Sequence, residues 1–384
     1  MADTAARRAP GLQLLFTLVF ALIGWDVGIG RLGDNSFFWH LRTGELILDH
    51  GIPHTDPYSF TAHGTTWVAQ SWLAEVLYGA LDRSFGAFGI RVLGGILGAL
   101  IATLAFRLAL RKCRDRVRAT LLTLVALGGV YTLWSQRPLL FGLVFLLVLL
   151  WIVEVPDSIV GRHPFVSLPV LFWLWANVHG TFALGFLYIV LHLLGRWLDG
   201  SRPWDGRERQ LATGALIAFV VIFVNPYGTA LVTFPIELLR RGDILNHVVE
   251  WHSPDFRQRF GIVYAVWIAV MVVVFSRGAH RVSRRDLVVS IPFLLLGLWA
   301  LRNVGIAPLV MLPIAASALS VDEERRDDRL AIGWVLAAIV LLVAVGLGAR
   351  AAGEPNFQFG DEPVQAMQSV QQHGLLGRRI FNDD

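Results

Sequence analysis

The sequence contains little charge: only 16% of its 384 residues are Asp, Glu, Lys or Arg, whereas 55% are hydrophobic. Soluble domains carry about 25% charged residues, so the composition excludes an ordinary soluble domain and indicates a polytopic membrane protein. Cysteine is almost absent as well, and Cys113 alone forms neither an internal disulfide nor a thiolate metal cluster. The sequence also lacks a repeat of fixed period and the inverted halves that point to a secondary transporter.

Apolar segments of membrane-spanning length are what the sequence has in quantity. We expect about eleven spans, at residues 11–30, 87–110, 119–133, 139–153, 165–176, 182–194, 211–224, 260–275, 287–301, 306–319 and 330–347. The first has no small-residue cleavage site before a mature domain, which favours a retained span over a cleaved signal peptide. The predicted fold is therefore an all-α, polytopic transmembrane helix bundle.

Arginine-rich segments give this bundle an orientation. The runs "RKCRDRVR", "GRWLDGSRPWDGRER", "RGAHRVSRR" and "DEERRDDR" fall on one side if the spans alternate, and the positive-inside rule makes that side cytoplasmic. The near-complete use of arginine in place of lysine is typical of a GC-rich bacterial genome. We therefore expect a multi-pass protein of the bacterial inner membrane, with a cytoplasmic N-terminus and an external C-terminus. Its expected parts are a transmembrane domain at 1–350, with a first external loop at 31–86, and a short external segment at 351–384.

The first external loop holds an unusual concentration of polar side chains. Residues 37–50 lack proline and predict a helix, which Asp34 or either of the next two residues can cap and which Gly51 ends. The stretch "TTWVAQSWLAEVLYGAL" predicts a second helix, rich in tryptophan and tyrosine. Helices of this kind lie along a membrane surface, so we expect both to be interfacial.

Polar residues that we expect at or near the external face form the candidate site. They share the ability to bind an anionic head group, accept a proton or orient a hydroxyl, and they are Asp34, Arg42, His54, Asp56, Arg137, His179, Glu250 and Arg302.

Each of these residues also has a purely structural interpretation. Asp34 can be a helix cap, and Arg42 can form a surface ion pair with Glu45, one helical turn away. His179 can satisfy backbone groups in a tight hairpin within "WANVHGTF", and the two arginines at the ends of spans can reach bulk lipid phosphates. The convergence of all these residues on one face is what favours a site.

The loop resembles the first external loop of the GT-C superfamily of membrane glycosyltransferases, and loosely that of oligosaccharyltransferase catalytic subunits and protein mannosyltransferases. The residues that carry this resemblance are "DNSFFWHLRTGELILDHG" followed by "DPYSFTAHGTTW". The loop resembles more closely a run of residues found in bacterial GT-C-like multi-span proteins, although Ser36 stands where that run has a second acid. "WSQRPLLFGL", "FWLWANVHGTFALG", "NPYG", "EWHSPDF" and "LRNVGIAPL" resemble further signatures of that group.

The resemblance implies transfer of a sugar from a polyprenyl-phosphate-linked donor to an envelope acceptor at the external face. The resemblance implies that Asp34 is the base of an inverting reaction. It also implies that Arg137, Arg302 and Arg42 bind the leaving phosphate and stabilise its charge. Glu250, Asp56, His54 and His179 would orient the acceptor or hold a divalent cation, for which Mg²⁺ or Mn²⁺ suits carboxylates. The expected partners are membrane lipid and the lipid-linked donor, with no nucleic acid.

Two alternatives remain open at this point. One is a transporter or flippase of a lipid-linked substrate, and the other is a non-catalytic GT-C-like protein in envelope polysaccharide assembly. The polar C-terminal segment, which predicts one helix near 363–373, resembles a segment that continues further in the bacterial group. This predicts a truncated or interrupted version of such a protein.

Overall fold

The expected all-helical fold is confirmed in the computed structural model, which describes residues 10–132, 134–202, 204–322, 328, 330, 332–354, 357 and 364–378. Within these ranges the backbone forms helices, and an isolated bridge pairs Thr55 with Thr66. The helices are α2 (Leu12–Gly28), α3 (Asn35–His50), α4 (Trp72–Cys113), α5 (Arg116–Thr132), α6 (Leu139–Glu154), α7 (Pro164–Val178), α8 (Phe182–Leu198), α9 (Gly206–Val221), α10 (Thr229–Arg240), α11 (Gly242–Leu245), α12 (Arg259–Arg277), α13 (Arg284–Trp299), α14 (Ile306–Ala318), α15 (Gly333–Ala352) and α16 (Val364–Gln372), with short 3-10 helices η1 (Val249–Trp251), η2 (Ala279–Arg281) and η3 (Leu301–Asn303).

Several helices have the length and composition of membrane spans. In the described ranges four segments are long and apolar enough to cross a bilayer: Trp72–Cys113, Arg259–Arg277, Leu301–Ala318 and Gly333–Ala352. The apolar helices α2, α6, α7 and α8 are shorter. All the segments expected to span the membrane coincide with helices, while their number as spans stays a prediction.

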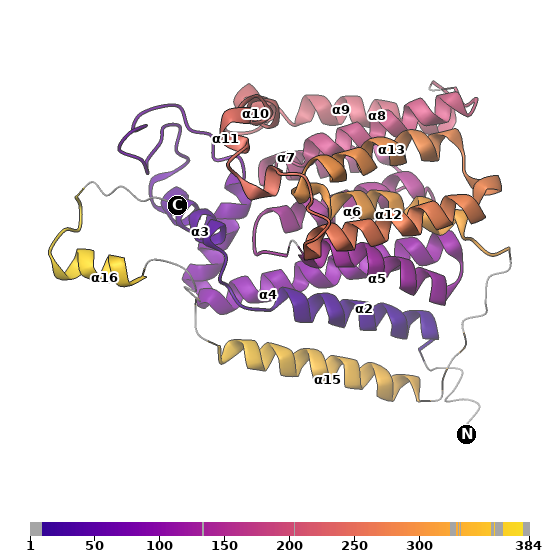
Figure 1. Ribbon diagram of the computed structural model, residues 1–384, viewed down its shortest axis with the longest axis horizontal. Helices are drawn as coiled ribbons and strands as arrows, with labels where there is room; N and C mark the ends of the chain where they lie inside the picture. Colours follow the sequence, from indigo (N-terminus) through magenta and orange to yellow (C-terminus); the bar gives the residue numbers. More distant parts are fainter. Residues whose placement is uncertain are drawn as a thin grey trace.

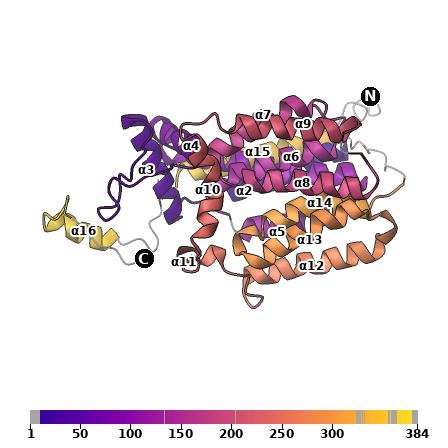
Figure 2. The same ribbon diagram turned by 90° about the horizontal axis from the view of Figure 1, so that it is seen from above.

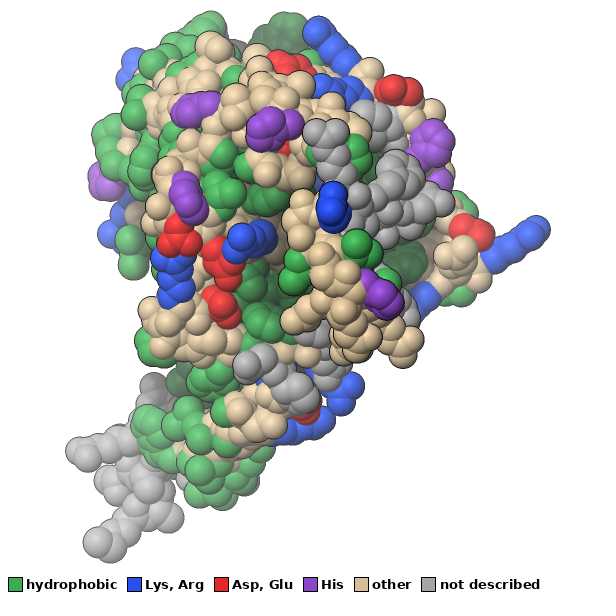
Figure 3. Space-filling view, turned by 90° about the vertical axis from the view of Figure 1, so that its left-hand side faces the viewer, with side chains coloured by type: hydrophobic (Ala, Val, Ile, Leu, Met, Phe, Trp, Pro, Cys, Tyr) green, Lys and Arg blue, Asp and Glu red, His purple; other side chains and the backbone are tan. Residues whose placement is uncertain are grey.

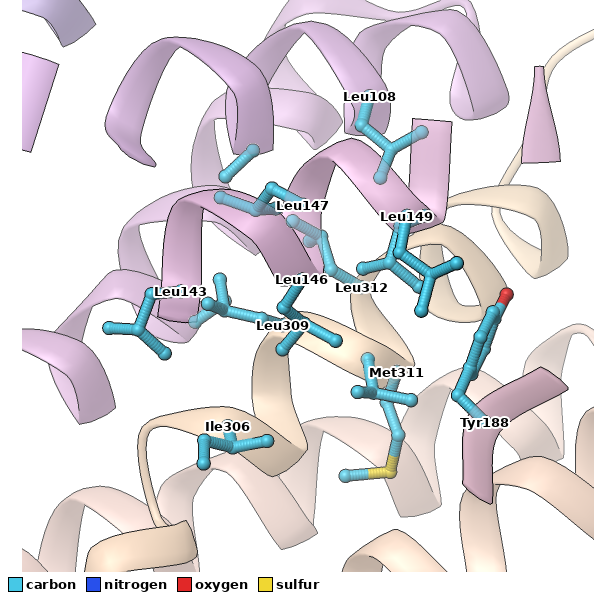
Figure 4. Packing of buried hydrophobic residues seen from close by; sticks show 14 of the residues in the cluster. Leu108, Leu143, Leu146, Leu147, Leu149, Tyr188, Ile306, Leu309, Met311 and Leu312 are labelled. Atoms are coloured by element: carbon cyan, nitrogen blue, oxygen red, sulfur yellow. The ribbon is translucent and has the colours of Figure 1, made fainter. Parts of the chain in front are cut away.

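The long helices lie side by side, with α15 along one edge next to α2 (Figure 1). One end of the bundle carries α3 and the start of α4, and α10 runs across it (Figure 2). We call this the α3 end, and the opposite end, where α4 and α6 finish, the far end. The centre is α14, whose Ile306, Leu309 and Leu312 are buried against leucines of α6 (Figure 4).

Glycine pairs allow α2 and α4 to cross in close contact. A Cβ on Gly24 would lie 2.1 Å from the carbonyl oxygen of Gly98, and one on Gly28 would lie 2.1 Å from that of Gly94. In lipid, helix association depends on such close backbone approach, because apolar side chains gain nothing by leaving the hydrocarbon. The crossing fixes the end of α2, and therefore the place where α3 begins.

The interfacial helix expected at 37–50 is confirmed as a helix, α3, and packs against the start of α4. The Asp34 side chain caps it by accepting a hydrogen bond from the Phe37 amide at 3.1 Å, and Gly51 ends it at a φ of 82°. The packed face brings Gly44 so close to α4 that a Cβ there would lie 1.8 Å from the Glu75 carbonyl oxygen. Phe37 is fully buried in the same contact, so α3 is held firmly.

Two expectations change in detail. The second loop helix does not begin at residue 65, because the chain there is extended and pairs Thr66 with Thr55. The helix begins at Trp72 and continues as α4 through a break at Gly86, whose φ is 60°. The stretch "WANVHGTF" is the tight turn between α7 and α8, and the C-terminal helix predicted near 363–373 is α16.

Candidate functional site

Asp34 lies at the junction between α2 and α3 and pairs with Arg137, which precedes α6. The Arg137 guanidinium donates from Nε to Asp34 Oδ1 at 3.0 Å and from Nη2 to Oδ2 at 2.9 Å. This is the bidentate geometry that makes an arginine–carboxylate pair strong and directional. Both side chains keep about a quarter of their surface exposed, at 22% and 25%.

Two further charged residues complete the group. Arg137 Nη1 donates a hydrogen bond to Oε1 of Glu250, a residue of η1. Arg302, from η3, lies over the indole ring of Trp251, with Cζ 4.4 Å from the ring centroid. We call Asp34, Arg137, Glu250 and Arg302 the α3-end cluster; its two acids and two bases come from four separate parts of the chain.

Connected cavities surround this cluster. A cavity of about 260 Å³ is lined by all four charged residues, with Trp134 among its apolar walls. It adjoins a cavity of about 340 Å³ through Asp34 and Trp134, and one of about 180 Å³ through Arg302. Figure 3 shows the α3 end face, where acidic, basic and histidine side chains gather around a recess with hydrophobic side chains in it.

The electrostatics of the cluster keep Asp34 ionised. Burial opposes ionisation of the Asp34 carboxyl, but the hydrogen bonds and charge of Arg137 outweigh it and hold the Asp34 pKa below its ordinary value. Burial also opposes the charge of Arg137, and the adjacent Asp34 and Glu250 reverse that effect and raise the Arg137 pKa. Near neutral pH the pair is therefore a carboxylate facing a guanidinium.

His179 lies on the other side of Arg302, in the turn between α7 and α8, and lines the 180 Å³ cavity. Burial, assisted by the positive charge of Arg302, lowers the pKa of His179 to about 3, so its imidazole is neutral. Its Nδ1 accepts a hydrogen bond from the Thr181 amide at 3.3 Å, which leaves the proton on Nε2. A neutral imidazole of this tautomer can donate a hydrogen bond from Nε2 to a bound ligand.

Three predicted site residues have local contacts instead. Arg42 pairs with Glu45 at 2.8 Å and its side chain is 69% exposed. The exposed His54 ring packs edge-on against Tyr227. Asp56 is buried and accepts hydrogen bonds from the Tyr58 and Ser59 amides, so it organises its own turn. None of the three lines the cavities of the α3 end that the described residues form.

Other residues line the site although they were not among the predicted site residues. Trp251, Trp134 and Ser135 line its cavities, and they lie inside the motifs "EWHSPDF" and "WSQRP" noted in the sequence. Where α3 packs on α4, His40 Nδ1 lies 2.8 Å from Glu75 Oε1. Glu75 is 3% exposed, and its signal in the sequence is an acid within the otherwise apolar "WLAEVLYGAL".

Neither metal-ligand geometry nor similarity to other proteins assigns a metal or a family. Among the described residues, no group of three or more His, Cys, Asp or Glu side chains is placed to hold a metal ion. No protein-family model matches the chain, and a search of curated proteins finds no significant match. The function is therefore inferred from the geometry of the α3 end together with the sequence motifs.

Proposed function

We propose that the chain is a GT-C-like membrane glycosyltransferase that moves a sugar from a polyprenyl-phosphate-linked donor to an envelope acceptor. The observation that carries this proposal is the α3-end cluster. It combines two guanidinium groups with an ionised carboxylate around connected cavities, at one end of a bundle that contains membrane-length helices. An anionic head group on a long apolar chain fits that combination of charge, cavity and lipid-facing surface.

The orientation follows from the arginine-rich runs. Those after α4, between α8 and α9, and between α12 and α13 all lie at the far end. By the positive-inside rule the far end faces the cytoplasm, so the α3 end faces outward in a bacterial inner membrane. A lipid-linked sugar in the outer leaflet would then meet the cluster at head-group depth.

Transfer requires a base and stabilisation of the leaving group. The acceptor hydroxyl oxygen bonds to the anomeric carbon, while Asp34 takes the hydroxyl proton. The bond from the anomeric carbon to the phosphate oxygen breaks, and the phosphate leaves with the electron pair. Arg137 and Arg302 offset the charge that develops on it.

Pairing with Arg137 makes Asp34 a weak base while no phosphate is bound, because a lowered pKa disfavours proton uptake. A bound phosphate would compete with Asp34 for the Arg137 guanidinium. Sharing that cation raises the Asp34 pKa towards its ordinary value, so binding of the donor itself strengthens the base.

A second candidate is a non-catalytic GT-C-like protein that binds the same lipid. The observation in its favour is that Asp34 already caps α3 and accepts both bonds of a bidentate ion pair. In that case the cluster holds the lipid phosphate and no proton moves.

The variant Asp34→Asn separates these two functions. Asparagine keeps an oxygen that can cap α3 but removes the charge and the basicity. In a deletion strain complemented with this variant, we expect lipid-linked sugars to accumulate and envelope glycans to be lost, as in the deletion itself. A decrease in transfer of about a hundred-fold or more is expected for loss of a general base.

Asp49→Asn is the matched control, because Asp49 lies at the opposite end of α3 and its ion-pair partner in the described part of the chain is the exposed Arg83, at 2.7 Å. It should complement the deletion fully. Full complementation by Asp34→Asn, with normal protein levels, would rule out Asp34 as the base and favour the non-catalytic candidate.

A further inference from the structure

A larger cavity opens at the far end of the bundle, and the proposed transfer makes no use of it. It has a volume of about 640 Å³ and lies between the start of α2, the last turns of α4 and the end of α6. That volume is within the range of small-molecule binding sites. We call it the far-end cavity.

The end of α4 makes the lining strongly basic. Arg107 and Arg111 line the far-end cavity one turn apart on α4, and Arg114, the left-handed residue that directly follows the helix, lines it as well. Lys112 also lines it, whereas its acidic residues are Glu154 and Asp157. Four positive and two negative side chains leave the lining with a net charge of +2.

Both acids of the lining are already committed. Asp157 pairs with Arg111, and Glu154 pairs with Lys112 at 2.7 Å. Arg107 and Arg114 are exposed, and within the described part of the chain neither side chain makes a hydrogen bond or an ion pair. The net positive charge is thus located on two guanidinium groups that border open volume.

Apolar side chains contribute part of the lining. Leu14 of α2 is 48% exposed, and Leu110 of α4 lines the same cavity between the arginines. The Trp151 indole nitrogen donates to the Leu104 carbonyl oxygen at 3.1 Å, so Trp151 presents only its ring to a ligand. A ligand that satisfies both the free guanidinium groups and these apolar side chains carries a phosphate and a hydrocarbon chain.

We propose that the far-end cavity binds the phosphate head group of an anionic membrane lipid, with Arg107 and Arg114 on the phosphate and the lipid chain along Leu14 and Leu110. Guanidinium groups bind phosphate oxygens through paired hydrogen bonds, which an ammonium group cannot reproduce. In the orientation given above this lipid belongs to the cytoplasmic leaflet. The site is independent of Asp34 and of sugar transfer.

The test compares two double variants that remove the same charge from the same end of the bundle. Arg107→Gln with Arg114→Gln changes the cavity, whereas Arg202→Gln with Arg209→Gln changes exposed arginines near the start of α9, outside the cavity. Purified proteins in phosphatidylcholine nanodiscs are titrated with phosphatidylglycerol, and bound lipid is counted by native mass spectrometry. A parallel arm adds pyrophosphate from solution.

We expect the cavity variant to bind phosphatidylglycerol about ten-fold or more weakly than the wild type, and the control variant to bind it like the wild type. Equal losses in both variants, or none in either, would overturn the site. If the wild type binds pyrophosphate as tightly as it binds phosphatidylglycerol, the ligand of the far-end cavity is a soluble phosphate and the lipid proposal is overturned. The Asp34→Asn protein should bind phosphatidylglycerol like the wild type. Failure of the lipid site can therefore be told apart from failure of the proposed sugar transfer.

Discussion

The two ends of the bundle each hold a cluster of two acids and two bases, and the clusters differ in burial. The far-end cluster consists of Lys112, Glu154, Arg285 and Asp286. Its Glu154 side chain is 5% exposed and accepts from Lys112, Arg285 and the Tyr188 hydroxyl. In the α3-end cluster, Glu250 is 38% exposed and Asp34 22% exposed, beside connected cavities.

This difference shows that balanced charge does not distinguish a binding site from a structural clamp. At the far end, Arg285 is bonded to Glu154, to Asp286 at 2.7 Å and to His192 Nδ1 at 3.1 Å, so the protein itself satisfies the guanidinium. At the α3 end, Arg302 lies over the Trp251 ring and borders two cavities. Access to open volume is what makes the second cluster a candidate for ligand binding.

The largest effect is expected from Glu154→Gln. The change leaves the buried Arg285 and the partly buried Lys112 with Asp286 as their one remaining acidic partner of the cluster. Breaking a buried ion pair in this way costs about 3–5 kcal/mol. Chemical or thermal unfolding of the purified protein in detergent measures this loss of stability.

Asp322→Asn is the matched control, because Asp322 pairs with Arg281 at 2.9 Å but is 93% exposed. It should cost no more than about 1 kcal/mol. Equal destabilisation by the two variants would mean that the far-end cluster is no clamp.

The variant His179→Gln is expected to have an intermediate effect, which is a change in how stability depends on pH. The His179 pKa is about 3 in the folded protein and near 6.5 when unfolded, so below pH 6.5 the unfolded chain gains a proton that the folded chain does not. Stability therefore falls as the pH decreases from 6.5 towards 3, by at most about 1.4 kcal/mol per pH unit for this group. In the variant, the decrease in Tm between pH 7 and pH 4.5, both within reach of a detergent-based melting assay, should be smaller. Identical pH profiles would contradict a neutral His179 in the folded protein.

The smallest effect is expected from Arg42→Gln. Because Arg42 and Glu45 form an exposed pair within one helix, the change should alter stability by about 0.5 kcal/mol or less. Complementation of the deletion strain should be unaffected. Loss of complementation in a normally folded variant would mean that Arg42 contributes to the substrate site after all.

The helices were predictable because a chain in lipid must satisfy its backbone groups within each segment, which leaves long apolar runs as a clear signal. The cap at Asp34 and the end of α3 at Gly51 were predictable for a similar local reason. Asp34 and Arg137 are 103 residues apart, and only the packing of α2, α4 and α6 brings them into a bidentate pair. The Arg42–Glu45 pair was visible in the sequence as a spacing of one helical turn. The turn in which the Tyr58 and Ser59 amides donate to Asp56 was not, because it depends on local backbone geometry.

The most direct test of the central claim is the phosphate preference of the α3-end cluster. Binding of a polyprenyl phosphate and of the uncharged polyprenol is compared in nanodiscs, with the far-end arginines Arg107 and Arg114 changed to glutamine so that the second phosphate site does not contribute. The account predicts about ten-fold or greater preference for the phosphate, lost in Arg137→Gln and kept in the exposed control Arg83→Gln. Equal binding of the two lipids, or an unchanged preference in Arg137→Gln, would contradict it.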